Sequence, residues 1–265
     1  MNKTELLDKY ARDGESRLLL ARVLDQQQRA DQRGIPTHTA FLSPAEQAMS
    51  ADLLMAAAPG QGVLHGGYAD AERKLWGFLP DWLDEDLWLA GEDCPLAALE
   101  VRVPKGAKLT HRDYLGSLMG LGITREKIGD ILIGETGAQV IVLRETLPIL
   151  LAQWEKAGRY PVTLTPLPLD QLAPTPGETK EVRATVASVR LDAVVSAGFS
   201  IPRSRAADLI RGGRVMVNHR PCEKADKVVE AGDVLTCRGL GKCVLTEIGG
   251  TSKRGRTILT IQRYL

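Results

Sequence analysis

A proline-rich segment constrains the fold of this chain more than any other feature. Residues 166–180 (PLPLDQLAPTPGETK) include Pro166, Pro168, Pro174 and Pro176. Proline fixes φ and lacks a backbone N–H, so neither a helix nor a central strand is expected to run through this segment. The chain has 265 residues, which is enough for more than one core. We therefore predict a semi-extended linker, placed at residues 169–182, between separately folded parts.

The two sides of this linker differ in charge. Residues 181–265 carry 15 Lys+Arg against 8 Asp+Glu, a balance of +7, and residues 1–180 carry 19 against 25, a balance of −6. The two balances add up to the net charge of +1 for the whole chain. A basic domain joined to an acidic remainder indicates a polyanionic partner for the C-terminal part.

Several classes of protein are disfavoured. No stretch approaches the ~18 uninterrupted apolar residues of a membrane span, and the charged N-terminus lacks the apolar core of a signal peptide. We expect a cytoplasmic monomer that makes no membrane contact.

The four cysteines are too few and too irregularly spaced for a disulfide framework. His219 and Cys222 have a ligand-like spacing, but no second close pair accompanies them, so thiols in a reducing compartment are favoured over a zinc site and no metal or cofactor is expected.

The residues before the linker predict two domains. Apolar periodicity favours helix over residues 2–33, with a break near Gly14, and Ser43, Pro44 and Glu46 form a helix-start signature. We assign residues 1–60 to an N-terminal helical region. Residues 61–168 form a second domain, in which the pattern from 96 to 166 reads strand–helix–strand–strand–helix–strand. This is the βαββαβ order of ferredoxin-like and RNA-recognition folds, and we expect its second helix to end at Gly158.

Residues 183–265 predict two short helices followed by a small β-sheet, so the whole chain is a multi-domain α+β protein. The first helix is expected to start at Ser188, run through Ser196 and end at Gly198. The second covers about 202–211, and Gly212-Gly213 then turns the chain into the first strand.

The stretch VRLDAVV…SAGFSIPRSRAADLIRGGRVMVNHR, followed by AGDVL, resembles the RNA-binding domain of small-subunit ribosomal protein four, the S-four domain. The resemblance covers about residues 188–240 and implies two short helices packed on a curved sheet that binds RNA. His219 departs from the pattern, since a glycine usually follows the asparagine there, and a slightly different turn is implied.

Cations concentrate in this stretch, and guanidinium groups suit bidentate contact with phosphate. The predicted RNA-binding residues are Arg190, Arg203, Ser204, Arg205, Arg211, Arg214, Asn218, Lys227, Arg238 and Lys242. Two assignments stay open, because Arg190 and Asp192 equally suit a structural ion pair and Asn218 suits a turn.

A second resemblance lies before the linker. HRDYLGSLMGLGITREKIGDILI (111–133), with ERKLWGFLPDWL and FLSPAEQ, resembles the YlmH family, whose members join a helical part, an RNA-recognition-like domain and an S-four domain. The resemblance implies a factor on obstructed large ribosomal subunits that carry peptidyl-tRNA. Arg112, Arg125 and Lys127 are candidates for a second RNA contact, although a solvated turn explains the last two equally well.

Catalysis finds no support in the sequence, because the four histidines are scattered and no nucleophile–base grouping stands out. The four tryptophans are expected to pack in cores or between domains rather than stack on bases. We therefore expect a non-enzymatic RNA-binding protein of ribosome-associated quality control, with no catalytic residue, whose partners are rRNA, tRNA as a further candidate, and the large ribosomal subunit. Two alternatives remain: an RNA-modifying enzyme targeted by the same domain, and a protein-interaction factor in photosystem assembly or cell division.

Overall fold

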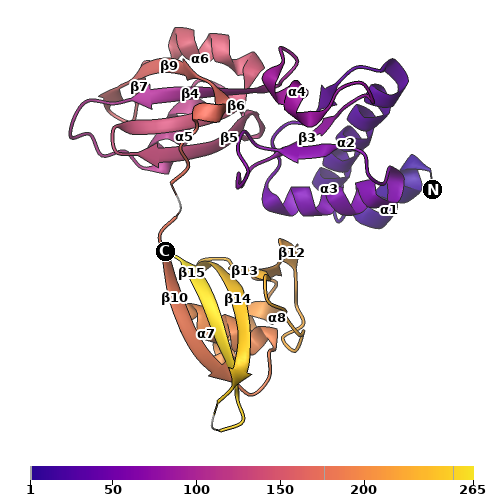
Figure 1. Ribbon diagram of the computed structural model, residues 1–265, viewed down its shortest axis with the longest axis vertical. Helices are drawn as coiled ribbons and strands as arrows, with labels where there is room; N and C mark the ends of the chain where they lie inside the picture. Colours follow the sequence, from indigo (N-terminus) through magenta and orange to yellow (C-terminus); the bar gives the residue numbers. More distant parts are fainter. Residues whose placement is uncertain (1, 176, 253) are drawn as a thin grey trace. The chain divides into compact units, whose positions relative to one another are not determined.

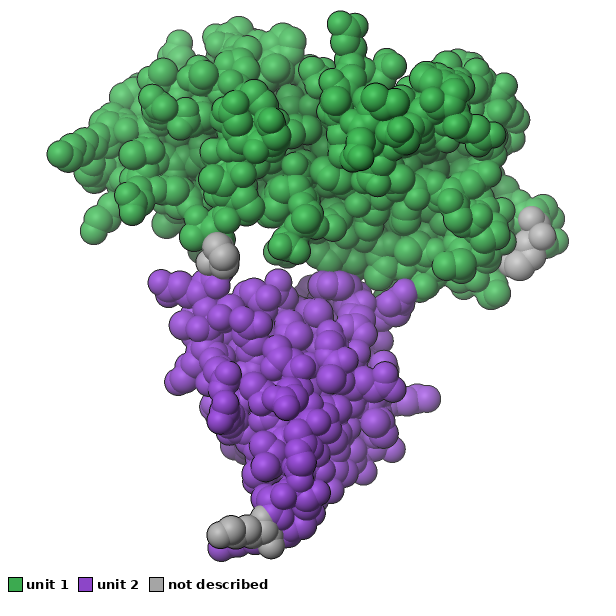
Figure 2. All heavy atoms as spheres, in the orientation of Figure 1, with its two compact units in different colours: residues 1–175 green, residues 176–265 purple. Residues whose placement is uncertain are grey.

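The chain folds as two compact units, residues 1–175 and 176–265 (Figure 2). The computed structural model describes residues 2–175, 177–252 and 254–265. The division falls inside the proline-rich segment, but residues 179–182, which were assigned to the linker, instead begin a strand of the second unit. Within the described residues, no helix is both long enough and apolar enough to cross a membrane.

Unit 1 begins with the predicted helices, and the break near Gly14 separates the first two. They are α1 (Lys3–Tyr10), α2 (Gly14–Arg33) and α3 (Pro44–Ala57). At the start of α3, the Ser43 N–H donates to the Glu46 carboxylate at 2.6 Å, which confirms the helix-start signature. A three-stranded sheet in the order β1–β3–β2 packs with these helices, from β1 (Thr37–His38), β2 (Val63–His65) and β3 (Leu75–Phe78). This sheet crosses the boundary that the sequence placed at residue 60.

The rest of unit 1 is a four-stranded antiparallel sheet in the order β5–β6–β4–β9, reached through the short helix α4 (Glu85–Ala90) (Figure 1). Its βαββαβ order confirms the prediction. The elements are β4 (Leu96–Arg102), α5 (His111–Gly120), β5 (Ile128–Gly134), β6 (Gly137–Leu143), α6 (Leu147–Gln153) and β9 (Thr163–Leu167), with single 3₁₀ turns at Arg125–Lys127, Arg144–Thr146 and Leu169–Gln171.

The second helix of this order is shorter than predicted. It ends at Gln153, and a small hairpin follows, formed by β7 (Lys156–Ala157) and β8 (Tyr160–Pro161). Trp154 is buried, and its indole N–H lies 3.0 Å from Ser117 Oγ and 3.1 Å from the Lys156 carbonyl oxygen. Gly158 is the turn residue of the hairpin, at φ 55°, rather than a helix cap.

Both faces of this sheet are buried. On one face, Leu99, Val140 and Val142 pack with α5 and α6. Side chains alternate along a strand, so Leu96 and Ile141 point to the other face. There they pack against residues from elsewhere in unit 1, including Phe41, Leu75 and Trp88.

Unit 2 is a six-stranded antiparallel sheet in the order β10–β15–β14–β13–β11–β12, with two helices on one face (Figure 1). Val194, Phe199 and Ile210 of the helices pack against Leu245 and Ile261 of the sheet. The elements are β10 (Thr179–Val186), α7 (Leu191–Phe199), α8 (Arg203–Arg211), β11 (Val215–Val217), β12 (Arg220–Pro221), β13 (Val234–Cys237), β14 (Gly241–Thr251) and β15 (Thr257–Tyr264). The α+β prediction is confirmed, and β10 is a strand that the sequence analysis missed.

The limits of α7 differ from the prediction at both ends. The Leu191 N–H donates to the Lys227 carbonyl, and the Val229 N–H donates to the Val189 carbonyl, so the residues before the helix are extended beside segment 227–229. The helix therefore starts at Leu191 and not at Ser188. It ends at Phe199, with Ser200 as the C-cap at φ 56°, rather than at Gly198. Gly198 lies inside the helix, and a side chain is disfavoured there because a Cβ would stand only 2.9 Å from Cys243 Sγ.

Candidate nucleic-acid interface

The carboxylate of Asp192 organises the start of the two-helix face. Its residue is 6% exposed, in the first turn of α7. The Arg203 guanidinium donates to both of its oxygens, at 3.0 Å from Nε and 3.1 Å from Nη2. Arg190 Nε lies 3.4 Å from the same carboxylate. Asp192 thus pairs with two of the predicted RNA-binding arginines, so the alternative of a structural ion pair applies to Arg203 as well as to Arg190.

A second group of arginines lies around α8 and the Gly-Gly turn. Arg205 and Arg211 are exposed on α8, and Arg211 makes only an exposed contact with Asp208 at 3.3 Å. Arg214, directly after the turn, accepts through its carbonyl from the Arg238 N–H at 2.9 Å, and its Nη2 donates to the Arg238 carbonyl at 3.1 Å. The fold therefore places Arg238 beside Arg214 although the two are 24 positions apart in the sequence.

The surroundings of the Cys237 thiol relate two of these arginines, Arg205 and Arg214, to each other. Burial raises the pKa of Cys237, and the positive charges of Arg214 and Arg205 act in the opposite direction. Both guanidinium groups are thus close enough to Cys237 for their charge to act on it. We call the exposed set Arg205, Arg211, Arg214 and Arg238 the α8 arginine group.

The turn between β11 and β12 has a structural role. Asn218 and His219 have φ values of 51° and 64°, the left-handed values that a type I′ turn requires at both central positions. The Asn218 side chain donates to Asp233 Oδ1 at 2.7 Å and accepts from the Val234 N–H at 2.9 Å. His219 thus has a left-handed conformation of the kind that glycine favours.

The remaining predicted residues of unit 2 are dispersed. Ser204 is exposed at the start of α8, and Lys227 is exposed beside the N-terminus of α7. Lys242 lies on β14, where its Nζ stands 4.2 Å from the centroid of the Tyr264 ring. This distance fits a cation–π contact.

The second candidate contact, in unit 1, is not a single cationic surface. Arg125 is about half-buried, and its Nη1 donates to the carbonyls of Ile128 at 2.7 Å and Gly129 at 3.3 Å. Burial, followed by the nearby charge of Arg73, lowers the pKa of Arg125 to about 10. Lys127 pairs with Glu145 at 2.9 Å, and Arg112 is exposed on α5. Arg125 thus holds the chain at the start of β5. Of the three candidates, Arg112 is exposed and has no acidic partner among the described contacts.

A network around Asp130 shows what the LGITREKIGDI stretch does in the fold. Asp130 accepts from the Tyr68 hydroxyl at 2.8 Å and from the N–H groups of Glu72 and Arg73 at 2.7 and 3.0 Å. Arg73 in turn donates to the Ile128 carbonyl at 2.9 Å and to the Phe41 carbonyl at 3.0 Å. The stretch therefore joins β5 to the N-terminal part of unit 1. Sequence reasoning missed this role because Asp130 and Arg73 are 57 positions apart.

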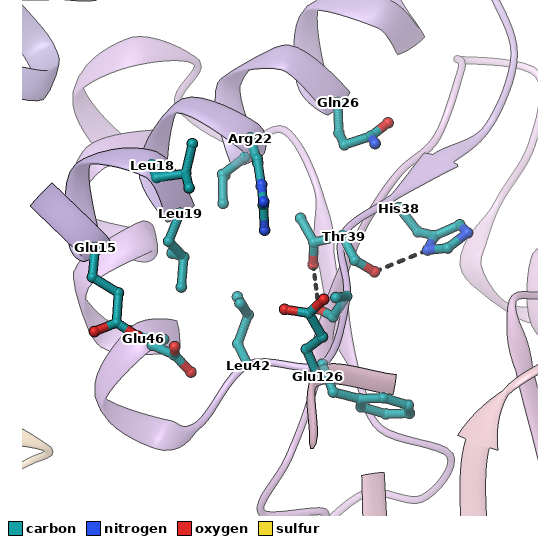
Figure 3. A pocket seen from close by; sticks show the side chains of 13 residues that line it. Glu15, Leu18, Leu19, Arg22, Gln26, His38, Thr39, Leu42, Glu46 and Glu126 are labelled. Atoms are coloured by element: carbon teal, nitrogen blue, oxygen red, sulfur yellow. Dashed lines mark hydrogen bonds between the residues drawn. The ribbon is translucent and has the colours of Figure 1, made fainter. Parts of the chain in front are cut away.

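Two pockets of unit 1 are not suited to phosphate. One of about 510 Å³ lies between α2, residues 38–42 and Glu126, and Figure 3 shows Glu15, Glu46 and Glu126 around it with Arg22. Another, of about 740 Å³, is lined by the four carboxylates of Asp31, Asp81, Asp84 and Glu85. Carboxylates repel a phosphate backbone, so the exposed cations are the better candidates for RNA contact.

The tryptophans agree in part with the prediction. Trp88 and Trp154 are buried, and Trp76 is half-buried with its indole N–H 2.8 Å from Ser50 Oγ. Trp82 is the exception, at 66% exposed. In the described parts of the chain, no group of three or more His, Cys, Asp or Glu side chains has an arrangement that could hold a metal ion.

Family models agree with the three-part organisation of this chain. Family models match at residues 15–77 ("YlmH, N-terminal"), 90–171 ("Putative RNA-binding domain in YlmH") and 189–235 ("S4 domain"). A relative from Bacillus subtilis (strain 168), "Ribosome-associated protein quality control protein P2", is 36% identical over 231 residues, which cover 85% of this chain and 86% of the relative. A solved structure, "Cell division protein ylmH from Streptococcus pneumoniae", is 24% identical, covers 60% of this chain and 94% of that chain, and has a TM-score of 0.49.

An S4 domain with exposed arginines, following a second RNA-binding domain, defines this protein as an RNA-binding protein of the S4 class. Both resemblances seen in the sequence are confirmed. The chain belongs to the YlmH family.

Proposed function

We propose that the α8 arginine group binds the phosphate backbone of ribosomal RNA and attaches this protein to the large ribosomal subunit. The observation that carries the proposal is the meeting of Arg205, Arg211, Arg214 and Arg238 around one helix and one turn, with only the exposed Arg211–Asp208 pair among their described acidic contacts. Exposed guanidinium groups at such a site suit phosphate oxygens, and their number sets the dependence of affinity on salt.

The role of the complex is ribosome-associated quality control of stalled nascent chains. Support comes from the name of the B. subtilis relative, which aligns with most of this chain. In this proposal the protein acts without catalysis and works as a cytoplasmic monomer, and the middle domain makes a second contact with rRNA or tRNA. In this proposal the α8 arginine group makes the main contacts with RNA, and Ser204, Lys227 and Lys242 add further contacts.

Arg190, Arg203 and Asn218 act differently in this proposal. The two arginines are held by Asp192, and the asparagine is held by Asp233 and the backbone of Val234. They shape the surface and supply at most part of its charge.

The experiment is a titration of labelled single-stranded RNA with the full-length protein at several salt concentrations. Replacement of Arg205, Arg211 and Arg214 by glutamine is expected to weaken binding and to make the log–log salt slope shallower by about 0.7 per lost phosphate contact. The matched control replaces Lys180, Arg183 and Arg254, which are also exposed cations of unit 2. Equal effects of the two triple variants would refute the assignment of the surface.

A further inference from the structure

A basic corner of the middle domain stands out within the acidic part of the chain. Residues 102–112 (RVPKGAKLTHR) contain Arg102, Lys105, Lys108 and Arg112 and no carboxylate. They form the connection between β4 and α5 and the first residues of α5. Lys105, Lys108 and Arg112 are exposed, whereas Arg102 pairs with Glu100 at 3.0 Å.

The β7–β8 hairpin lies against this connection. A Cβ at Gly158, the hairpin turn, would lie 3.3 Å from Leu109 Cδ2 and 3.6 Å from Asp113 Oδ1. The hairpin therefore brings Lys156 and Arg159, both exposed, to the residues just before and inside α5. The sequence did not predict that Lys156 and Arg159 lie near α5, because the pattern over 147–158 favoured one long helix.

Buried residues and hydrogen bonds fix the β7–β8 hairpin against α5. Ala157 is fully buried, and the buried Trp154 donates from its indole N–H to Ser117 on α5. The Val162 N–H donates to the Glu155 carbonyl at 3.0 Å across the base of the hairpin. The cations at its tip thus project from a fixed backbone, which lowers the entropic cost of binding.

An aromatic ring accompanies these cations. Tyr160 is partly exposed, and the Arg159 guanidinium lies 5.0 Å from the centroid of its ring. Cations that follow a phosphate backbone, together with an aromatic ring on which a base can stack, are the two parts of a site for single-stranded nucleic acid. The one carboxylate of α5 nearby, Asp113, is occupied by the N–H and hydroxyl of Thr110, both at 2.7 Å.

The sheet of the middle domain offers no equivalent platform at its centre. RNA-recognition domains stack bases on the open face of their sheet. Here the face that carries Leu96 and Ile141 is covered by Phe41, Leu75 and Trp88. An RNA contact of this domain therefore has to use a different surface.

We propose that Lys105, Lys108, Arg112, Lys156, Arg159 and Tyr160, which we call the α5 corner, form a second RNA-binding site for a single-stranded segment. The site deepens the proposed function, since it gives the middle domain its RNA-contacting residues. It requires Arg112 but neither Arg125 nor Lys127. The alternative ligand is an acidic protein, which the cations of the α5 corner could also bind. The Tyr160 ring favours RNA, because a base can stack on it.

The test uses full-length protein and a labelled single-stranded RNA of about 20 nucleotides, long enough to span a typical site. Replacement of Lys105, Lys108 and Arg112 by glutamine is expected to weaken binding about tenfold at moderate salt and to reduce the salt slope by about 0.7 per contact. The matched control replaces Arg12, Arg29 and Arg33, three exposed cations of unit 1 that lie outside the corner. Equal affinities for these two triple variants would overturn the proposal.

Two further variants test the composite nature of the site. Lys156→Gln with Arg159→Gln is expected to reduce the slope as well, and Tyr160→Leu is expected to weaken binding about tenfold without changing the slope, because stacking releases no counterions. If Tyr160→Leu has no effect and an acidic peptide displaces the RNA from this surface alone, the site is a polyanion site for protein and the proposal fails. The α8 variants separate this failure from a failure of the proposed function, since they leave the α5 corner intact.

Discussion

At the scale of single residues, Arg203 illustrates how the structure changes the meaning of a motif. The SIPRSRAADLIR pattern suggests that all its arginines face RNA, but Arg203 supplies two hydrogen bonds to a carboxylate that is almost fully buried. A charge-reversal experiment at this position would therefore measure folding and RNA binding together. Arg205, two residues on, is exposed and is the cleaner choice.

We expect Arg203→Glu to destabilise unit 2 by about 2–4 kcal/mol, because it removes the partner of a buried carboxylate and adds a second negative charge beside it. Arg205→Glu is expected to change stability by no more than about 0.5 kcal/mol. Urea unfolding of the two variants, followed by circular dichroism, measures both values. Equal stabilities would show that the Asp192 pair contributes nothing to the fold.

Asn218 gives a second prediction at this scale. Its side chain donates to Asp233 Oδ1 and accepts from the Val234 N–H, and its backbone has the left-handed φ of 51°. We expect Asn218→Ala to lower the free energy of unfolding by about 1–2 kcal/mol, because both hydrogen bonds are lost and alanine disfavours the left-handed conformation. Thermal unfolding measures the change, and an unaltered melting temperature would contradict the structural role of Asn218.

At the scale of elements, the sequence predicted what short-range patterns determine. Periodicity and caps were sufficient for α3, α5 and α8, and the order of elements was sufficient for the βαββαβ sheet. The sequence failed where a distant segment decides the outcome. Trp154 continues the helical spacing of α6 but packs on α5 as the anchor of a hairpin, and β10 exists because β15 pairs with it over eight residues.

The candidate site follows the same division. Arg205, Arg211 and Arg214 are close in the chain, so their grouping was predictable from the sequence. The pairing of Arg214 with Arg238 and of Arg203 with Asp192 depends on tertiary contacts, which no local pattern reports.

The hydrogen bond from Tyr68 to Asp130 of β5 leads to a prediction about how stability depends on pH. Burial, together with the neighbouring carboxylate of Asp130, raises the pKa of Tyr68 above its ordinary value. The unfolded chain then releases this proton first, so the contribution of Tyr68 to stability is complete below about pH 10 and is lost as the pH rises further. We expect the free energy of unfolding to fall more steeply above about pH 10 in the wild type than in Tyr68→Phe. Identical pH profiles would contradict the Tyr68–Asp130 pairing.

At the scale of the whole molecule, the two units differ in charge. Unit 2 carries the net positive charge and the S4 domain, whereas unit 1 carries acidic pockets and one basic corner. Two RNA contacts on a chain with a proline-rich connection raise affinity through effective concentration, provided that both sites can engage one RNA assembly.

The central claim is that the α8 arginine group attaches this protein to the large ribosomal subunit. It is tested most directly by sucrose-gradient sedimentation of the tagged protein in lysate, at low and at moderate salt. We predict co-migration with free large subunits that is lost as salt rises, and that is absent when Arg205, Arg211 and Arg214 are replaced by glutamate. Protein at the top of the gradient under both conditions, or unchanged co-migration of the triple variant, would contradict the account.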